Sequence, residues 1–239
     1  MPIIDAHTHV VPQRLEVQPA RDRLWPSLEH RDGGHASVVI AGKVFRELDT
    51  RSWDVARRRE DMDAEGVDAQ ILSPMPELLS HWLPADDADH LSQLMNEQIA
   101  SMIAAAPKHF HGLGMVPIQD VELAVKRMSD IRTLGLCGVE IGTHINGIPL
   151  GDARLMPFYA AAEALDLSIL VHPPHPTGLD RIGGPRELGA VASFPLETAF
   201  AAVSLLAGHV LEKFPKLRIL LSHGGGAFAW INPRIDYVW

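Results

Sequence analysis

The sequence predicts an α/β fold in which short parallel strands alternate with longer helices. Six brief apolar runs are each bounded by Gly or Pro, which is typical of strands buried on both faces. Between these runs, apolar residues recur every three or four positions, as they do along one face of a helix. Strand–helix alternation of this kind indicates parallel β/α units. Histidines stand at the ends of several apolar runs, and their positions bear on how the sheet closes.

The six predicted strands are distributed along the whole chain. In order, they cover Ile3–His9, Asp68–Pro74, His111–Pro117, Cys137–His144, Leu167–Pro174 and Leu217–Gly226. All six are short and apolar, so we expect them to be buried on both faces of one sheet.

Helices are predicted in the intervals between the strands. The segment Trp53–Gly66 precedes the second strand, and Gly66 is a suitable helix stop. Asp120 is a suitable N-cap for a helix that follows over Val121–Ile131. The other helices are predicted over Leu91–Ala106, Leu155–Leu165, Pro195–Lys213 and the residues after Gly226.

Two closures of such a sheet compete: an open doubly wound sheet and a (β/α)8 TIM barrel. No G-x-G-x-x-G motif follows the first strand and the chain has no P-loop, so nothing favours the nucleotide-binding open sheet. The histidines favour the barrel, because barrel enzymes place their chemistry at the C-terminal ends of the strands. Only six strands precede Trp239, so we expect residues 1–239 to form a single barrel domain whose last two β/α units are missing from this chain.

Two segments interrupt the alternation. Residues 10–50 are too long for a simple connection, and within them Ala36–Leu48 is predicted to form a hairpin that turns at Ala41–Lys43. We expect this insertion to form a small flap over the mouth of the barrel. The Gly- and Pro-rich segment Thr177–Ser193 is predicted to be a second long loop at the mouth.

Composition excludes several classes of protein. The formal net charge of −9 argues against a nucleic-acid-binding surface, which needs clustered Lys and Arg. The single cysteine, Cys137, leaves no intramolecular disulfide and fits a reducing compartment. The chain shows neither a signal-peptide pattern nor an uninterrupted apolar stretch long enough to cross a bilayer. We therefore expect a cytoplasmic protein that binds neither nucleic acid nor membrane.

Two histidines close the first predicted strand. Side chains alternate between the faces of a strand, so His7 and His9 point the same way and Asp5 lies on that face one step deeper. Two imidazoles placed in this way can bind one metal ion together, and Asp5 could accept the free N–H of a ligand. For this motif alone, two partly exposed loop histidines are an equally good interpretation.

Histidines at two later strand ends favour the metal site. His172 closes the fifth strand and precedes two prolines, and His223 closes the sixth and precedes three glycines. Four histidines at one edge of a parallel sheet are difficult to explain by packing, so we predict a metal site there. Imidazole suits zinc and other borderline transition metals better than calcium or magnesium.

The runs DAHTH, LVHPP and LLSHGGGAFAWINPRIDYVW resemble the amidohydrolase superfamily, a set of metal-dependent (β/α)8 enzymes. The resemblance extends from Ile3 to Trp239. Within the superfamily, these motifs most resemble the branch that contains 2-amino-3-carboxymuconate-6-semialdehyde decarboxylase, other non-oxidative decarboxylases, hydratases and hydrolases.

The resemblance implies a role for each strand-end histidine. His7, His9 and His172 correspond to metal ligands, and His223 to a catalytic histidine that handles the proton of a metal-bound water. The remaining ligand of the family is an aspartate at the end of strand eight, which this sequence does not contain. Asp236 cannot replace it, because Asp236 falls in the predicted helix after strand six. The fourth strand lacks the bridging lysine of binuclear members, so the resemblance implies a mononuclear site.

The resemblance also implies how a substrate is held. Arg46, in the predicted flap, corresponds to an arginine that binds the substrate carboxylate, and Arg234 to one that reaches the active site of a neighbouring subunit. A guanidinium suits this task because it can bond both carboxylate oxygens at once. An arginine supplied by a neighbour implies a homodimer. Glu140 and His144 are more simply interpreted as rim residues, while His175 could be a substrate contact or a loop residue.

Three hypotheses about function follow. The first is a metal-dependent decarboxylase of a small unsaturated or aromatic carboxylic acid, with one Zn²⁺ ion (or Mn²⁺) and His223 as acid and base. The second, within the superfamily, is a hydrolase or hydratase of a carboxylated small molecule. The third is an inert fragment or a binding protein that keeps the strand ends without a complete site. Release of CO₂ would distinguish the decarboxylase from the hydrolase or hydratase. Absence of bound zinc would indicate the inert fragment or binding protein.

Overall fold

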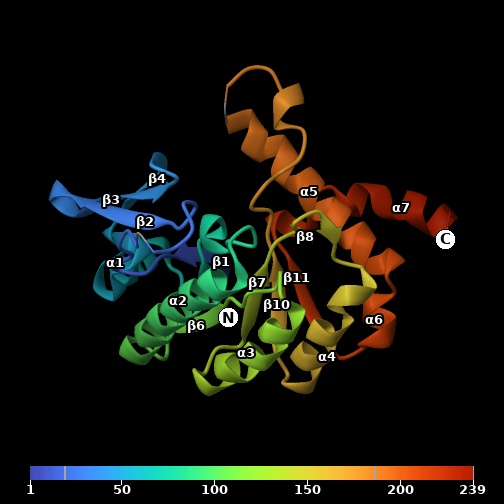
Figure 1. Cartoon of the computed structure of the whole chain (residues 1–239), viewed down its shortest axis with the longest axis horizontal. Coiled ribbons are helices and arrows are strands. Elements are labelled where there is room, and N and C mark those ends of the chain that lie inside the picture. The colour runs from blue at the N-terminus through green and yellow to red at the C-terminus, as the bar shows by residue number, and fades with distance from the viewer. Residues whose placement is uncertain (19, 186, 239) are drawn as a thin grey trace.

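A six-stranded parallel sheet is the centre of the fold in the computed structural model, which describes residues 1–18, 20–185 and 187–238 (Figure 1). Its strands are β1 (Ile4–Val10), β5 (Ala69–Pro74), β6 (Phe110–Gly114), β7 (Gly138–Ile141), β10 (Ser168–Val171) and β11 (Arg218–Leu221). Each overlaps one of the six predicted strands, so the sequence pattern located all of them. The strands hydrogen-bond in the order β1-β5-β6-β7-β10-β11, and every pair is parallel.

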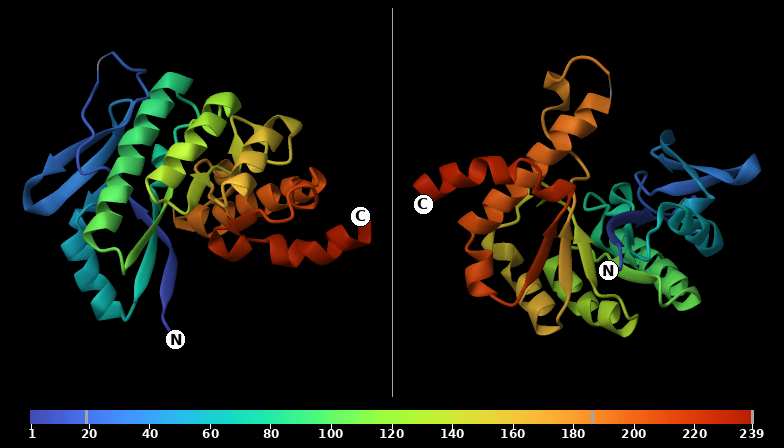
Figure 2. Two further views of the ribbon diagram at one scale, coloured as in Figure 1. Left: turned by 90° about the horizontal axis from the view of Figure 1, so that it is seen from below. Right: turned by 180° about the vertical axis from the view of Figure 1, so that it is seen from behind.

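The order of the strands distinguishes the two closures considered above. A doubly wound sheet reverses its strand order at a switch point, whereas the described strands follow the chain without reversal. Because parallel crossovers are right-handed, connections that always step in one direction place their helices on one face of the sheet. The sheet then curves with its helices outside, as in the wall of a β/α barrel. Figure 2 shows this layering from below and from behind.

The helices between the strands form where the apolar periodicity predicts them. They are α1 (Val55–Glu65), α2 (Ala85–Ala105), α3 (Val121–Thr133), α4 (Met156–Ala164), α5 (Glu187–Ala207), α6 (Val210–Lys213) and α7 (Phe228–Val238). Asp120 caps α3 by accepting a hydrogen bond from the backbone N–H of Leu123, as predicted. Gly66 ends α1 with a left-handed φ of 71°, which glycine adopts without strain.

The core lies between the sheet and this helical layer. Helix α2 buries Leu91, Met95 and Ile99 completely, and Phe110 at the start of β6 is also fully buried. Removing each such side chain from water contributes about 1.5–3 kcal/mol. The core therefore holds β6 rigidly and, through the ladder of parallel pairs, the strand ends that carry the histidines.

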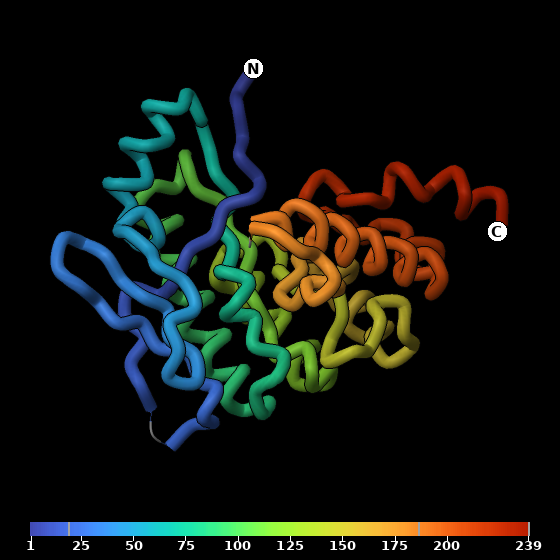
Figure 3. Tube along the Cα trace, turned by 90° about the horizontal axis from the view of Figure 1, so that it is seen from above, coloured from blue at the N-terminus to red at the C-terminus, as the bar shows by residue number. Residues whose placement is uncertain are grey.

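The insertion after β1 is a small antiparallel sheet, and we call it the flap. It contains β2 (Ser27–Arg31), β3 (His35–Ile40) and β4 (Lys43–Asp49), paired in the order β2-β3-β4. The predicted hairpin is β3–β4, and its turn includes Ala41 and Gly42, both with positive φ. Strand β2 escaped prediction because its last three residues are charged or polar and exposed. In Figure 3 the flap, in blue, lies on the opposite side of the chain from α5 and α7.

Helix α5 corrects one expectation. The predicted loop over Thr177–Ser193 ends early, because α5 begins at Glu187 and runs through Pro195. The sequence pattern predicts that this helix starts at Pro195, but α5 accommodates Pro195 in its interior. A shorter hairpin of β8 (His144–Ile145) and β9 (Ile148–Pro149) follows β7.

Among the described residues, α5 is also the one helix long and apolar enough to cross a bilayer by length and composition alone. It buries Ser193, Glu197 and Thr198 against the rest of the chain, and the side chain of Glu197 accepts a hydrogen bond from the backbone of Thr177. These contacts pack one side of α5 against the rest of the chain.

Candidate metal centre

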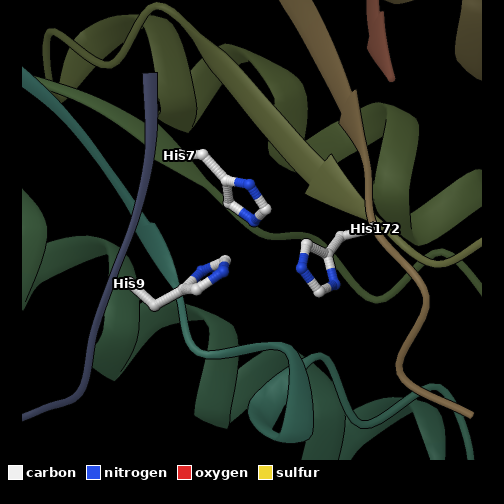
Figure 4. Close-up of side chains that lie close together, drawn as sticks. All are labelled: His7, His9 and His172. Atoms are coloured by element: carbon white, nitrogen blue, oxygen red, sulfur yellow. The ribbon is translucent and has the colours of Figure 1, made fainter. Parts of the chain in front are cut away.

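Three histidines from two distant parts of the chain meet at the C-terminal edge of the sheet (Figure 4). His7 and His9 lie on β1, and His172 directly follows β10. The rings point toward one another because parallel strands bring their carboxyl ends to one edge. One ring nitrogen from each histidine lies within 4.8 Å of the nitrogens of the other two. The ring centroids are 4.9–5.1 Å apart, close enough for one ion to be shared.

His223 lies beside this cluster. Its ring centroid is 5.3 Å from that of His7 and 4.9 Å from that of His172. Its backbone has a φ of 53°, a conformation that non-glycine residues rarely adopt and that is often found at functional sites. The Oγ of Ser222 lies 3.0 Å from Nδ1 of His223, and the Oγ1 of Thr198 lies 3.4 Å from it. These contacts occupy Nδ1 and leave Nε2 for other chemistry.

The orientation of His9 is fixed by the neighbouring strand. Its Nδ1 lies 3.0 Å from the carbonyl oxygen of Pro74 and 3.0 Å from the Oγ of Ser73. A carbonyl can only accept, so Nδ1 carries the hydrogen and donates it to Pro74, which leaves the lone pair on Nε2. This is how proteins orient a histidine that binds a metal. The H-x-H motif does not predict this hydrogen bond to Pro74, which lies 65 residues further along the chain.

Burial keeps these imidazoles neutral. Removal from water is the main cause that lowers the pKa of His9 to about 3 and that of His172 to about 2, with neighbouring histidines adding to both effects. Burial likewise lowers the pKa of His7 and of His223. A metal ligand must be deprotonated, so this environment favours metal binding over protonation.

The donor set fits a divalent metal ion. His172 is 5% exposed, and its buried Nδ1 has no hydrogen-bond partner among the described residues. An orphaned buried nitrogen is unfavourable unless a ligand satisfies it. Neutral imidazoles from His7, His9 and His172 suit zinc, manganese and similar ions, and three protein ligands are typical of a catalytic centre with an open position.

The other acidic and histidine residues considered from the sequence have different positions. Glu140 is buried on β7 with its Oε2 3.8 Å from Nδ1 of His9, and burial raises the pKa of Glu140 well above its usual range. Asp5 accepts a hydrogen bond from the backbone N–H of His7. His144 accepts one from the backbone of Gly147 in the β8–β9 hairpin. Asp236 lies on α7, as predicted.

The two predicted substrate arginines lie in different places. Arg46, on β4 of the flap, is close enough to the cluster for its charge to lower the pKa of His9. Its Nη2 is 2.6 Å from Oε1 of the buried Glu77. Arg234 lies exposed on α7, which points away from the sheet (Figure 1). Within one copy of the chain, the structure therefore brings Arg46 toward the histidines and not Arg234.

A cavity of about 760 Å³ opens between the flap and the segment that follows β10. Its lining includes Arg46 from the flap, Glu77 from the turn after β5, His175 from the segment after β10 and Phe194 from α5. Phe194 stacks on the ring of His223 at a centroid distance of 5.6 Å. The cavity wall that Phe194 forms therefore lies next to His223, the candidate catalytic residue. The cavity volume suits a small organic molecule.

Sequence reasoning missed several residues of the site. Glu77 follows β5 in the run SPMPELL, and Ser73 and Pro74 end that strand. Their only sequence signal is their position just at or after a strand end, where barrel sites form. Thr198 lies on α5, and nothing in the sequence connects it to His223.

The fold and the strand-end histidines define a class of β/α-barrel-type proteins with a candidate metal site at the C-terminal edge of the sheet. The family model described as amidohydrolase matches residues 4–239. The chain belongs to the amidohydrolase family.

Several relatives are decarboxylases of the branch that the resemblance predicts. The chain is 34% identical over 238 residues to 2-amino-3-carboxymuconate-6-semialdehyde decarboxylase of Dictyostelium discoideum, covering 98% of this chain and 66% of that protein. It is 30% identical to gamma-resorcylate decarboxylase of Polaromonas sp., covering 83% of this chain and 64% of that protein. The chain thus spans slightly less than two thirds of the length of these relatives.

Solved structures share the fold. The apo form of Metarhizium anisopliae IDCase superposes with a TM-score of 0.83 at 22% identity, over 99% of this chain and 68% of that one. The 5-carboxyvanillate decarboxylase of Novosphingobium aromaticivorans, complexed with manganese and 4-hydroxy-3-methoxy-5-nitrobenzoic acid, gives a TM-score of 0.69 at 30% identity, over 79% of this chain and 55% of that one. The fold is therefore of the amidohydrolase type.

Proposed function

We propose that this chain is a metal-dependent, non-oxidative decarboxylase of a small unsaturated or aromatic carboxylic acid. The observation that carries the proposal is the convergence of His7, His9 and His172 from two distant strands on one point beside a cavity. The names of the relatives support it, since those proteins are decarboxylases of such acids. We also propose that the curved sheet is part of a closed (β/α)8 barrel and that residues 10–50 form a flap over its mouth.

The three histidines would hold a single divalent ion, Zn²⁺ or alternatively Mn²⁺. Such an ion supplies Lewis acidity, which polarises a bound oxygen and makes its proton easier to remove. The manganese in the carboxyvanillate decarboxylase structure favours a divalent ion in this branch.

The residues of the chain would perform the remaining steps. Arg46 holds the carboxylate of the substrate, because its guanidinium lines the cavity and lies near His9. His223 takes up a proton from solvent at Nε2 and passes it to the carbon that bears the carboxylate. The bond from that carbon to the carboxylate then breaks, its electron pair restores the unsaturation, and CO₂ leaves. The net reaction replaces CO₂ with a proton, so no oxidant or reductant is needed.

Arg234 would act in a neighbouring copy. The side chain is exposed on α7, which extends away from its own cluster. We propose that a homodimer forms in which Arg234 of each chain contacts substrate in the other, and that the enzyme works in the cytoplasm.

A hydratase or hydrolase is the alternative. One relative, 27% identical over 172 residues, is 2-keto-4-carboxy-3-hexenedioate hydratase of Sphingobium sp.. The same strand-end histidines could serve either reaction, because both need a polarising ion and a proton carrier.

The test is release of CO₂ from a panel of hydroxybenzoic, aminobenzoic and muconic acids by zinc- or manganese-loaded protein. We expect CO₂ from at least one acid and none from the His223→Ala variant. Water addition or hydrolysis without CO₂ would support the alternative. Failure to retain any metal after reconstitution would support the inert protein considered above.

A further inference from the structure

Two cavities meet at one buried carboxylate. Beside the cavity of about 760 Å³ lies a smaller one of about 270 Å³, between the flap and the segment after β10. Both are lined by Phe45, Glu77, Pro174 and His175. Among the described residues, Glu77 is the one acidic side chain that lines both cavities, so it lies where they meet.

Only one of the two carboxylate oxygens of Glu77 has a partner among the described residues. The residue is 8% exposed, and its Oε1 accepts a hydrogen bond or ion pair from Nη2 of Arg46 at 2.6 Å. Its Oε2 is buried and has no hydrogen-bond partner among the described residues. A carboxylate has about four acceptor positions, so most of the capacity of Glu77 is unused.

An unused buried acceptor is unfavourable in the empty protein. Leaving a buried polar group unpaired destabilises a fold, and the effect is larger when the group is charged. Such groups are rare in proteins, and each one requires an explanation such as a catalytic role or a bound water, ion or ligand. The position of Glu77, at the border of two cavities, indicates that the missing donor arrives with a ligand.

The charges around Glu77 restrict what that ligand can be. Arg46 neutralises Glu77, so an anionic substrate is not repelled from the cavity. The contact from Nη2 of Arg46 to Oε1 of Glu77 uses part of the guanidinium fork, which has five N–H groups in all and can also donate to a substrate carboxylate. A ligand that uses both residues therefore carries a carboxylate for Arg46 and, on another part of the same molecule, a hydrogen-bond donor for Glu77.

The smaller cavity has several aromatic rings in its lining. Trp82 and His175 meet edge to face there at a centroid distance of 4.7 Å, and Phe45 faces the same space. Flat aromatic or conjugated groups pack well against such walls. Glu77 supplies the acidic acceptor in the lining of this cavity, and among the described residues Lys43 is the one lysine or arginine that lines it.

We propose that Glu77 is a specificity-determining residue whose free carboxylate oxygen accepts a hydrogen bond from a hydroxyl or amino substituent of a flat carboxylic acid bound to Arg46. The substrates are then hydroxy- or amino-substituted aromatic or conjugated acids, and acids without a donor substituent are selected against. This proposal rests on the proposed function and names its substrate class more narrowly.

The test compares dissociation constants within matched pairs of acids. The probes are 3-hydroxybenzoate against 3-methoxybenzoate and 4-hydroxybenzoate against 4-methoxybenzoate, titrated calorimetrically into the zinc-loaded protein. The two members of a pair share the carboxylate and the oxygen, and only the hydroxyl can donate. Because a hydrogen bond to a charged group is stronger than one between neutral groups, we expect the hydroxy member of at least one pair to bind about tenfold more tightly or better.

Two variants separate the acceptor from the general effect of charge. Glu77→Gln should reduce the preference to less than about threefold, because a neutral amide is a weaker acceptor. Glu29→Gln, on the exposed side of the flap strand β2, makes the same change in net charge and should keep the wild-type preference. Unsubstituted benzoate reports any loss of carboxylate binding through Arg46, so that loss cannot be mistaken for the loss of the acceptor.

A wild-type preference near one for both pairs overturns the proposal, as does a preference that survives Glu77→Gln. If Glu77→Gln does not fold, Glu77→Asp, whose carboxylate is one methylene shorter, takes its place with the same expected loss. If neither variant folds, a structure of the wild-type complex decides by whether the hydroxyl lies within hydrogen-bond distance of Oε2. Dissociation constants do not depend on turnover, so absence of CO₂ release with an intact preference removes the decarboxylase proposal alone.

Discussion

At the scale of single residues, burial gives the histidines their character. His172 and His9 titrate far below neutral pH because their rings are removed from water, and both therefore present lone pairs at physiological pH. The hydrogen bond from His9 to the carbonyl of Pro74 then decides which nitrogen carries the lone pair. His223, with Nδ1 held by Ser222, keeps Nε2 for a proton. Chemically identical side chains thus receive different tasks from their surroundings.

Loss of a ligand and loss of the proton carrier should be separable. We expect His172→Ala to reduce bound zinc from about one equivalent to a small fraction, because a two-histidine site binds weakly. His223→Ala should retain most of the metal and lose turnover by about a hundredfold or more, as expected for removal of an acid–base group. Metal analysis after dialysis, with CO₂ release measured in parallel, checks both. A fully active His223→Ala enzyme would refute its assigned role.

A buried histidine outside the metal cluster should make stability depend on pH. Burial lowers the pKa of His81 from 6.5 to about 3, so the unfolded chain binds a proton that the folded chain does not. Stability from this group is complete above pH 6.5 and falls as the pH drops toward 3, by about 1.4 kcal/mol per pH unit.

The His81→Gln variant tests this sign. The slope of unfolding free energy against pH, measured by urea titration between about pH 7 and 5, should decrease by up to about 1.4 kcal/mol per pH unit. His111→Gln is the control because His111 is exposed. Equal slopes in wild type and His81→Gln would contradict the prediction.

At the scale of elements, close approach of strands fixes the geometry of the sheet. Gly138 begins β7 opposite Ser168 on β10, and a Cβ at Gly138 would overlap the carbonyl oxygen of Ser168. Only glycine lets the two strands pair at this register. The pairing matters for function, because β10 carries His172 and β7 carries Glu140 to the same edge.

Gly138→Ala should therefore destabilise the fold. The added methyl forces a backbone shift, and we expect the free energy of unfolding to fall by about 1–3 kcal/mol or more. Gly183→Ala is the matched control, because nothing lies within 4 Å of its added Cβ, and it should change stability by less than about 0.5 kcal/mol. Chemical denaturation of both variants gives the comparison, and equal losses would argue against the register effect.

At the scale of the whole molecule, the cavity is built from segments that belong to different layers. The flap contributes Arg46, the turn after β5 contributes Glu77, and α5 contributes Phe194. None of these elements forms a pocket alone. Helix α7 extends beyond this assembly, and its exposed Trp230 and Tyr237 accompany Arg234 on the part that we propose reaches a second copy.

Mixing of inactive variants tests the contribution of Arg234 in trans. Arg234→Ala and His223→Ala should each be nearly inactive alone. After mixing and subunit exchange, each heterodimer regains one complete site, so activity should recover to about a quarter of wild type. The matched control is Arg46→Ala mixed with His223→Ala, which should not recover, because Arg46 and His223 serve the same site. No recovery in the first mixture would show that Arg234 does not act across subunits.

Much of the fold was accessible from the sequence because it depends on local patterns. The six strands, the cap of α3 by Asp120 and the stop of α1 at Gly66 all follow from nearby residues. The start of α5 at Glu187 was missed because Pro195 is an ambiguous signal, being common at helix starts and tolerated here within a helix. The exposed, charged β2 was missed because its pairing depends on β3 and not on its own composition.

The sequence by itself determined the alternation of strands and helices and the placement of histidines at strand ends, because both are properties of neighbouring residues. Only the tertiary structure decided that His9 donates to Pro74, that His223 is held by Ser222 and Thr198, and that Glu77 joins Arg46 at the border of two cavities. Those contacts join residues that, apart from Ser222 and His223, lie 25 to 65 positions apart. Such pairs meet only after the strands have paired in register, and no local pattern records their meeting.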